Sequence, residues 1–300
     1  MGDPVNPGRN DASLACRSVR FNYPDGTIGL ADVDLEVSAG ELMALLASNG
    51  SGKTTLIKVL GGLLKPQSGS VTIGGMDINR LSNGLLYRRL GLLMQNPKDQ
   101  LFGVTVDEDV SCGPRNLGLG DVEVERRVVE ALASVEGSHL LGRPIHHLSF
   151  GEQKRIALAG VLAMKPSIML LDEPTAGLDP AGEMHMVSLL QQLNREMGIT
   201  MVFATHAVDL LPLFADRICV LERGRVVECG LTREVLNGKD MLGRAGLRLP
   251  YIASLFHEMK QYDGIYFDRM PLTVGEARRE ILSLLVGNGC IHYGGGMDHE

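Results

Sequence analysis

The stretch MALLASNGSGKTTLIKVL, residues 43–60, decides the fold. An apolar run leads through a glycine-rich turn into a second apolar run, which predicts a strand, a tight loop and a helix in that order. In a phosphate-binding loop of this kind, backbone N–H groups surround the phosphates, Lys53 reaches the outer oxygens and the Thr54 hydroxyl ligates Mg²⁺. The strict pattern begins with Gly, where this chain has Ala47, and Ala is excluded there only if its φ is positive.

Composition limits what the rest of the chain can be. Its 300 residues, 44% of them hydrophobic, can bury one large core or two moderate ones. The formal net charge of -7 argues against non-specific nucleic-acid binding, since that affinity comes from neutralising phosphates. The five cysteines form no CxxC pair, so neither a disulfide framework nor a zinc site is indicated. We see no signal peptide and no membrane-spanning run, so any membrane role is expected to be by docking.

Apolar patterning predicts two kinds of strand. Continuous apolar runs, typical of parallel strands buried on both faces, occur at 41–46, 167–171 and 200–204. By contrast, LADVDLEV at 30–37 alternates apolar with acidic residues, which predicts an antiparallel strand with one wet face. Residues 216–230 predict a hairpin near a sheet edge.

Helical spacing of apolar residues appears between these strands. The expected buried stripes are Val124, Val128, Leu132 and Val135 in one helix and Met186, Leu190, Leu193 and Met197 in another. Strands that alternate with helices predict an α/β protein with a central, mostly parallel sheet. From about Thr232 the pattern changes, and we expect a small C-terminal extension with two short helices and a flexible tail.

A second acidic motif, IMLLDEPTAGLD at 168–179, places Asp172 at the tip of a buried strand, followed by Glu173. A carboxylate there can hold Mg²⁺ through water, and a second one beside it can polarise an attacking water. The alternative is an exposed acidic turn without function, because acidic loop residues are common.

Together these motifs resemble the ATP-binding-cassette (ABC) ATPases over residues 13–237. The ordered elements are Tyr23 in FNYPDG, the loop at 47–55, Gln95 in LMQNPKDQLF, LSFGEQKR at 148–155, LLDE at 170–173, AGLD at 176–179 and ATH at 204–206. The resemblance implies a P-loop NTPase cassette with a mostly parallel sheet, an antiparallel β subdomain and a helical signature subdomain at about 97–164. It would be flanked by a flexible lead at 1–12 and the extension at 238–300, which looks like that of cobalt/nickel-type energy-coupling-factor importers.

The resemblance implies ATP and Mg²⁺ as cofactors. ATP-binding residues would be Tyr23, Asn49, Gly50, Ser51, Gly52, Lys53, Thr54, Thr55, Ser149 and Gly151. Magnesium would be held by Thr54, Gln95 and Asp172, and the catalytic group would be Lys53, Gln95, Glu173 and His206. Tyr23 is expected to stack on adenine, a contact worth about 1 to 3 kcal/mol. His206 would hydrogen-bond the γ-phosphate, and Gln95 would sense the metal and the attacking water.

The segment LSFGEQ departs from the family's usual Leu-Ser-Gly-Gly-Gln at Phe150 and Glu152. The resemblance assigns Ser149 and Gly151 to the γ-phosphate of the opposite subunit's ATP, and a helix N-terminus suits an anionic ligand. Glu152 is expected to put negative charge near that contact. A serine N-cap with no further role is the alternative.

Because the phosphate loop and the segment with Ser149 are expected on two different faces of the chain, we expect two copies to close head to tail when ATP binds. They would form a homodimer that hydrolysis reopens. The resemblance implies the ATPase subunit of an importer for cobalt or nickel, peripheral on the cytoplasmic face of the membrane. Its partners would be integral membrane transport and substrate-binding components, and no nucleic acid is expected. A helix of the membrane component would dock beside Asp99, where Leu101 and Phe102 are expected to be exposed.

Three alternatives stay open. The first is a sibling of the leading cobalt/nickel interpretation, the shared ATPase of vitamin importers, which differs only in its partner. A non-transport ABC ATPase would show coiled-coil insertions, a tandem cassette or a basic groove, none of which is seen. A regulatory nucleotide-binding module without turnover is the third, against which Glu173 and His206 argue.

Overall fold

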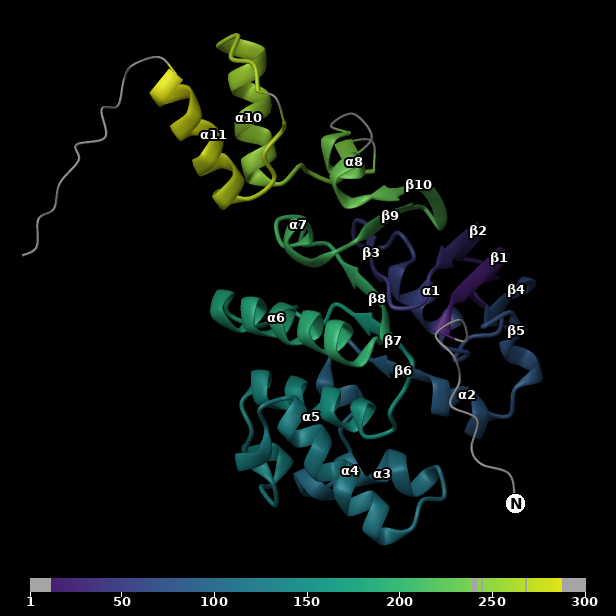
Figure 1. Cartoon of the computed structure of the whole chain (residues 1–300). Helices are drawn as coiled ribbons and strands as arrows, with labels where there is room; N and C mark the ends of the chain where they lie inside the picture. Colours follow the sequence, from purple (N-terminus) through teal and green to yellow (C-terminus); the bar gives the residue numbers. More distant parts are fainter. Residues whose placement is uncertain (1–11, 239–241, 244, 268, 288–300) are drawn as a thin grey trace, which may run out of the picture.

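The computed structural model describes residues 12–238, 242–243, 245–267 and 269–287 (Figure 1). The flexible lead expected at 1–12 lies outside these residues except for Ala12, and the flexible tail expected at GGGMDHE, 294–300, lies wholly outside them. Ala12 is buried, and its carbonyl oxygen accepts a hydrogen bond from Thr200 Oγ1 at 2.8 Å. The chain is therefore tied to the central sheet from Ala12 onward.

A six-stranded sheet forms the centre of the molecule, in the order β10-β9-β3-β8-β7-β6. Its strands are β3 (Leu42–Leu46), β6 (Leu90–Leu93), β7 (Ile168–Asp172), β8 (Thr200–Thr205), β9 (Arg217–Glu222) and β10 (Arg225–Leu231). All neighbours pair in parallel except β9 and β10. The three continuous apolar runs are confirmed as buried parallel strands, and the expected hairpin is confirmed at the sheet edge.

A second, four-stranded sheet is antiparallel, in the order β2-β1-β4-β5. Its strands are β1 (Leu14–Asn22), β2 (Ile28–Val37), β4 (Ser68–Ile73) and β5 (Met76–Asp77). In β2, Val33, Leu35 and Val37 are buried while Asp34 and Glu36 are exposed. The alternating pattern is confirmed as a strand with one wet face.

The helices connect and cover these strands (Figure 1). They are α1 (Lys53–Leu60), α2 (Asn83–Arg89), α3 (Val106–Asn116), α4 (Asp121–Ser134), α5 (Phe150–Leu162), α6 (Pro180–Met197), α7 (Leu211–Phe214), α8 (Thr232–Asn237), α10 (Tyr251–Tyr262) and α11 (Val274–Gly287). Short 3₁₀ turns are η2 (Ile78–Arg80), η3 (Pro97–Asp99), η4 (Ser138–Leu140) and η5 (Ile145–His147).

The predicted apolar stripes are buried, with one exception. The stripe of α4 and the first three residues of the stripe of α6 lie in the core. Met197 was expected to join them, and this is wrong, because its side chain is 48% exposed. Met197 is the last residue of α6, and Gly198 turns the chain away in the left-handed conformation, with φ of 66°.

The six-stranded sheet separates two hydrophobic clusters. Along β3, Leu42, Ala44 and Leu46 belong to the cluster that also contains α3 to α6. Met43 and Leu45 belong to the other cluster, with α1 and the four-stranded sheet. Because β3 feeds alternate residues to both clusters, its whole length is apolar, and its C-terminal end is fixed from two sides where the phosphate loop begins.

The chain beyond α8 begins inside the main core. Leu242, Leu249 and Ala253 belong to the same cluster as the central sheet, while α10 and α11 continue outward beyond α8 (Figure 1). An ion pair between Arg233 and Glu276 links α8 to α11. No helix in the described ranges is long and apolar enough to cross a membrane.

Candidate nucleotide-binding site

The end of β3 and the start of α1 border a cavity of about 290 Å³. Its lining residues are Tyr23, Thr27, Ile28, Gly29, Ser48, Asn49, Gly50, Gly52, Lys53, Thr54, Thr55, Gln95 and Glu173. Nine of the residues expected to handle the nucleotide or its metal are among them. Segments from β1, β3, α1, β6 and β7 thus converge at the C-terminal edge of the parallel strands, where ligands bind in open α/β sheets.

Two glycines give the loop its curl. Gly50 and Gly52 have φ of 79° and 102°, in the left-handed region that favours glycine. A Cβ on Gly52 would lie 2.5 Å from the carbonyl oxygen of Gly29, so this position also needs glycine for space. Ser51, a predicted site residue outside the cavity lining, is buried, and its Oγ lies 2.8 Å from Ser48 Oγ.

Ala47 fits its position without strain. It is not among the non-glycine residues with positive φ in the described part of the chain, as expected if Ala is tolerated there. The side chain is fully buried among the apolar residues of α1 and β3. Alanine in place of the first glycine of the motif is therefore compatible with the backbone conformation of the loop.

Lys53 is folded back over the loop. Its Nζ donates hydrogen bonds to the carbonyl oxygens of Ala47 at 2.6 Å and Ser48 at 3.3 Å, and lies 3.6 Å from Glu173 Oε1. Burial lowers the pKa of Lys53 below its ordinary value, while the nearby Glu173 opposes that shift. An ammonium group in this place offers a concentrated positive charge to phosphate oxygens in the cavity.

Asp172 carries an orphaned buried oxygen. The residue is 1% exposed, and its Oδ1 has no hydrogen-bond partner among the described residues. Burial raises the pKa of Asp172, and a hydrogen bond with the Thr54 side chain opposes this. With the Thr54 hydroxyl beside it and the Gln95 amide at the cavity, the donor set is all oxygen, as Mg²⁺ prefers. These residues fit a magnesium ion.

Glu173 stands between two cationic or polar partners. Its carboxylate faces Lys53 on one side, and His206 Nδ1 lies 2.9 Å from Oε1 and 3.0 Å from Oε2. Glu173 is 5% exposed, whereas the His206 side chain is 56% exposed. The backbone of Glu173 has φ of 47°, an uncommon conformation for a non-glycine residue that persists only when its surroundings hold it.

Tyr23 lies at the cavity with its orientation fixed. Its hydroxyl is 2.8 Å from Thr55 Oγ1, and its ring packs edge-on against Phe21 with centroids 5.0 Å apart. The ring is half-buried, so one part of it remains available to a planar ligand. This geometry suits the expected stacking role. The Thr55 hydroxyl, an expected nucleotide contact, lies against the Tyr23 hydroxyl.

Ser149 and Gly151 do not line this cavity. They lie at the N-terminus of α5, where Ser149 is exposed. Glu152 completes a capping box: the Ser149 N–H donates to Glu152 Oε2 at 2.7 Å, and the Glu152 N–H donates to Ser149 Oγ at 3.3 Å. Arg143 Nη1 adds a contact at 3.6 Å, and the hydrogen bonds to Ser149 lower the pKa of Glu152.

The expected negative charge of Glu152 is therefore present at this helix start, where it is engaged by hydrogen bonds and an ion pair. The carboxylate is occupied by the backbone of its own helix start and by Arg143, which offsets its charge. The pattern Ser-x-x-Glu at 149–152 is the sequence signal for a capping box, and it was missed. Phe150 packs its ring close to Gly177, where an added Cβ would lie 2.9 Å from the ring.

Sequence reasoning also missed Lys154. This lysine is 2% exposed, and its Nζ donates to the carbonyl oxygens of Glu173 and Pro174, each at 3.0 Å. The available signal is its place on α5, four residues before Leu158 and seven before Val161, both buried.

The segment after Gln95 differs partly from expectation. Phe102 is 72% exposed, as expected, but Leu101 is half-buried and packs against the core beside the helices. Gln100 explains this turn inward, because its side chain accepts from Met94 N–H at 3.0 Å and donates to Leu92 O at 3.3 Å. The exposed apolar surface here is Phe102 with Val104, and not Leu101.

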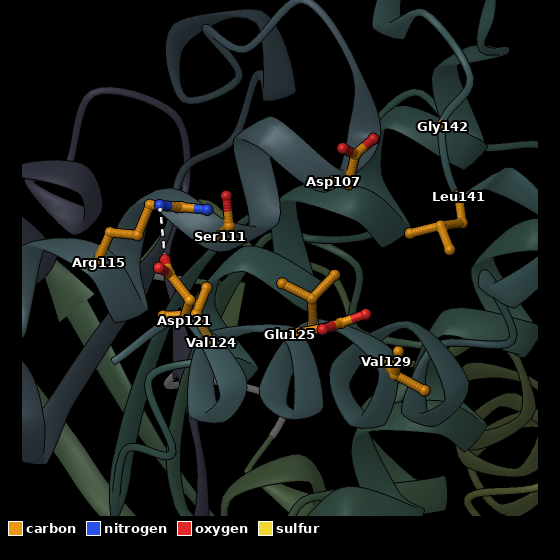
Figure 2. Close-up of a pocket in the computed structure, with 10 residues that line it drawn as sticks. Asp107, Ser111, Arg115, Asp121, Val124, Glu125, Val129, Leu141 and Gly142 are labelled. Carbon is orange, nitrogen blue, oxygen red and sulfur yellow. Dashed lines mark hydrogen bonds and ion pairs between the residues drawn. The ribbon is translucent and has the colours of Figure 1, made fainter. Parts of the chain in front are cut away.

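A larger cavity of about 550 Å³ lies between α3 and α4 (Figure 2). Figure 2 shows Arg115 paired with Asp121, while the acidic Asp107 and Glu125 also border the hollow. Among the described residues that line it, Arg115 is the one cation and is paired with Asp121, and they include no glycine-rich loop, so this cavity does not suit a phosphate ligand. The smaller cavity is therefore the candidate nucleotide site.

The strand, loop and helix with Lys53, the buried Asp172 and the adjacent Glu173 define a P-loop nucleoside triphosphatase cassette. The ABC transporter family matches residues 30–176. A putative ABC transporter ATP-binding protein of Geobacter sulfurreducens is 50% identical over 88% of this chain and 95% of its own length. EcfA of Methanococcus maripaludis, an energy-coupling factor transporter ATP-binding protein, is 42% identical over 92% and 99%.

Two solved structures of ATP-binding cassettes have a similar fold. CbiO1 from Clostridium perfringens, part of the ABC transporter complex cbiONQ, has 40% identity and a TM-score of 0.70, covering 81% of this chain and 98% of its own. The dimeric ATP-binding cassette MJ0796, bound to ADP and Pi, has 29% identity and a TM-score of 0.66 over 73% and 99%. The chain belongs to the ABC transporter ATP-binding proteins, within the energy-coupling-factor type.

Proposed function

We propose that this ABC ATPase hydrolyses ATP to ADP and phosphate to drive import of a transition-metal ion, cobalt or nickel, through separate membrane subunits. One observation carries the ATP hydrolysis: Lys53, Thr54 and Glu173 meet in one cavity, beside a buried Asp172 oxygen that has no partner among the described residues. The metal cargo rests on the resemblance of the sequence. Hydrolysis of a phosphoanhydride is mainly a matter of position and charge, and these residues supply both.

Within the site, each residue has a proposed task. Lys53 leaves the carbonyl oxygens of the loop and pairs with the outer phosphates, while Tyr23 holds the base. Thr54, Gln95 and Asp172 would hold magnesium, which supplies positive charge against the phosphate oxygens. Glu173, released from Lys53, accepts a hydrogen bond from the attacking water and aligns it.

In this proposal, His206 orients the Glu173 carboxylate and stabilises the γ-phosphate. Its Nδ1 already contacts the Glu173 carboxylate, so the imidazole fixes the direction of that carboxylate. Its other ring nitrogen, Nε2, is the one that can meet the γ-phosphate. The large exposure of the His206 side chain leaves room for that approach.

Ser149 and Gly151 point to a second copy of the chain. A Cβ on Gly151 would meet only Leu178 Cδ2, at 3.6 Å, which is an ordinary contact. The chain's own packing therefore does not require glycine at the start of α5, whereas close approach of an external phosphate would. We propose a head-to-tail homodimer with each loop facing the other subunit's Ser149, and MJ0796 provides a dimeric cassette of similar fold.

The membrane partner would dock on the exposed pair Phe102 and Val104, beside Asp99 in the turn η3. This surface follows directly from Gln95, so movement at the nucleotide is passed to the docked helix over a few residues. The names of EcfA and of the cbiONQ complex support association with membrane components. The chain would then be peripheral, on the cytoplasmic face of the membrane. Cassette boundaries at 13–237 and an extension from 238 remain part of this proposal.

Glu173→Gln tests the proposal most directly. The amide keeps the shape of the side chain but aligns water poorly, so phosphate release should fall by about 100-fold to 1000-fold while ATP binding persists and a dimer accumulates. Gel filtration with ATP and a phosphate-release assay give both results. Undiminished turnover in this variant would refute the assignment of Glu173.

The substrate needs its own measurement. The purified chain, reconstituted with its membrane components in vesicles, should take up radioactive Co²⁺ or Ni²⁺ on addition of ATP. Uptake of a vitamin with no metal uptake would replace the metal proposal by the vitamin importer and leave the ATPase assignment intact. ATP hydrolysis that no membrane component stimulates would favour a non-transport ABC ATPase.

A further inference from the structure

A buried ammonium group lies behind the nucleotide cavity, outside its lining. The Nζ of Lys154 on α5 donates to the carbonyl oxygens of Glu173 and Pro174, at 3.0 Å in both cases. It also lies 5.5 Å from the centroid of the Phe150 ring. The side chain is 2% exposed, so it belongs to the fully buried interior of the protein.

Burial of a lysine costs free energy of folding unless hydrogen bonds or an opposite charge compensate its ammonium group. Burial lowers the pKa of Lys154 to about 8, which shows how strongly its surroundings disfavour the charge. An apolar side chain at the same place would avoid that cost, and replacing buried charges by apolar residues often stabilises a protein. Stability of the core therefore does not explain a lysine here, whereas its two hydrogen bonds do.

Both of these hydrogen bonds end on the turn that aims Glu173. The φ of 47° at Glu173 puts its carboxylate beside Lys53 and His206, and an uncommon backbone conformation of this kind needs outside support. Support comes from the Glu173 N–H, which donates to Ala204 O at 2.9 Å, and from Lys154 on the carbonyl side. The lysine is the one charged group on the backbone of this turn among the hydrogen bonds that the described residues show.

We propose that Lys154 is a positioning residue for Glu173, which joins the helix that reads the partner's nucleotide to the carboxylate that acts in its own site. The same helix begins at Ser149 and Gly151, one turn before Lys154. A shift of α5 on contact with the partner's ATP is thus carried by a single side chain to the turn after β7. This inference rests on the proposed function of Glu173.

Three variants separate positioning from mere stability. Lys154→Met keeps a long flexible stem but loses the positive charge and all hydrogen-bond donors. Lys154→Arg keeps the positive charge and has hydrogen-bond donors. Lys165→Met is the matched control, because it removes an exposed lysine just after the same helix, where Nζ pairs with Glu130 at 2.9 Å. Each is measured by thermal unfolding, by equilibrium ATP binding and by steady-state hydrolysis of Mg·ATP.

We expect Lys154→Met to lower kcat by between about 10-fold and 100-fold, as misplacement of a catalytic group does, with KM for ATP within about twofold. Lys154→Arg should recover a large part of kcat, and Lys165→Met should match the wild type. Amide hydrogen exchange of residues 172–178 in the nucleotide-free protein should speed up in Lys154→Met and stay slow in Lys154→Arg. That last measurement does not depend on hydrolysis.

Wild-type kcat in a folded Lys154→Met variant would overturn the positioning role while leaving the ATPase proposal in place. Equal losses of kcat in the Met and Arg variants, with unchanged hydrogen exchange at 172–178, would also overturn it. If Lys154→Met fails to fold, the decision passes to Lys154→Gln, whose amide donates without charge. Exchange at 172–178 faster than in Lys154→Arg then supports the positioning role, and exchange equal to the wild type overturns it. A wild-type protein without ATP hydrolysis would remove the proposed function and this inference together.

Discussion

The phosphate loop and the start of α5 are both expected to bind phosphate, yet the chain treats them differently. Around the loop, side chains from five elements converge, Lys53 is 7% exposed and Asp172 has a buried unpaired oxygen. At the start of α5, Ser149 is exposed, and a Cβ added to Gly151 would make only an ordinary contact. The first site is assembled by the chain's own packing, and the second is a capped helix end facing outward.

This difference shows what one chain can and cannot complete. The loop side brings Tyr23, Thr54, Gln95 and Glu173 to one cavity, and the buried Asp172 lies next to it through its hydrogen bond with Thr54. The helix start offers the exposed Ser149 and a favourable dipole. A composite site between two copies accounts for both conditions, since each copy brings what the other lacks.

The largest effect should come from mixing two inactive variants. Lys53→Met removes the phosphate-binding cation, and Gly151→Asp puts an acidic group at the helix start, where it suits the helix dipole but repels phosphate. Each variant alone should lose activity by about 100-fold or more. In an equimolar mixture, half of the dimers are mixed and each has one intact composite site, so activity should recover to about a quarter of the wild type.

The control for this experiment is a mixture of each variant with itself at doubled concentration. Phosphate release is measured against total chain, with thermal unfolding to show that both variants fold. A mixture as inactive as its components would contradict a site shared between two copies. It would place Ser149 and Gly151 in the role of an ordinary helix cap.

Asp172→Asn, on the phosphate-loop side, should give the next largest effect. Hydrolysis should fall by about 100-fold because a magnesium ligand loses its charge. Because burial raises the pKa of Asp172, ionisation destabilises the nucleotide-free fold progressively as the pH rises from the ordinary pKa of the group to the raised one. The variant should therefore be more stable at pH 7, by about 1 kcal/mol, and this advantage should vanish as the pH falls below about 4.

Calorimetry without nucleotide over this pH range measures the effect, with Mg²⁺ titration for the ligand role. Asp121→Asn is the control, since its carboxylate is exposed and pairs with Arg115 on the surface. A less stable Asp172→Asn protein at pH 7 would show that the carboxylate is well satisfied without metal.

The sequence predicted the loop side of the molecule well, because its signals are local. Continuous apolar runs and the alternation in β2 follow directly from which faces each strand buries. Gly50 and Gly52 stand where φ is positive, which the motif alone demands. The misplaced residues, Met197 and Leu101, lie where a helix ends or a loop turns, and the spacing of apolar residues carries no information about such ends.

Other features depend on contacts between distant segments and could not be derived from spacing. The Lys154 ammonium is tied to a turn 19 residues further along the chain, and charged residues are usually assigned to the surface. The left-handed backbone of Glu173 is visible only once β7 and β8 pair, with Glu173 N–H bonded to Ala204 O. Glu152 is an intermediate case, since the capping-box pattern was present in the sequence.

Glu152→Ala should affect the helix start alone. It leaves the Ser149 N–H without its partner at 2.7 Å and should lower the free energy of unfolding by about 1 kcal/mol. Glu152→Gln retains an acceptor and should lose less than half as much. Urea unfolding of both variants measures this, and a gain in ATPase activity in Glu152→Gln would show that the carboxylate does oppose the partner's phosphate.

Ala47→Gly should have the smallest effect on function, and it decides whether the loop is strained. Ala47 already has a φ that any residue adopts, so glycine relieves nothing and ATP affinity should change by less than about 1 kcal/mol. The buried methyl group packs with α1, and its loss with the added freedom of glycine should cost about 1 kcal/mol of stability. Isothermal titration with ATP and urea unfolding separate these two quantities. A large gain in affinity would mean that Ala47 holds the loop away from its binding shape, and the loop, rather than the start of α5, would then be the incomplete half of the site.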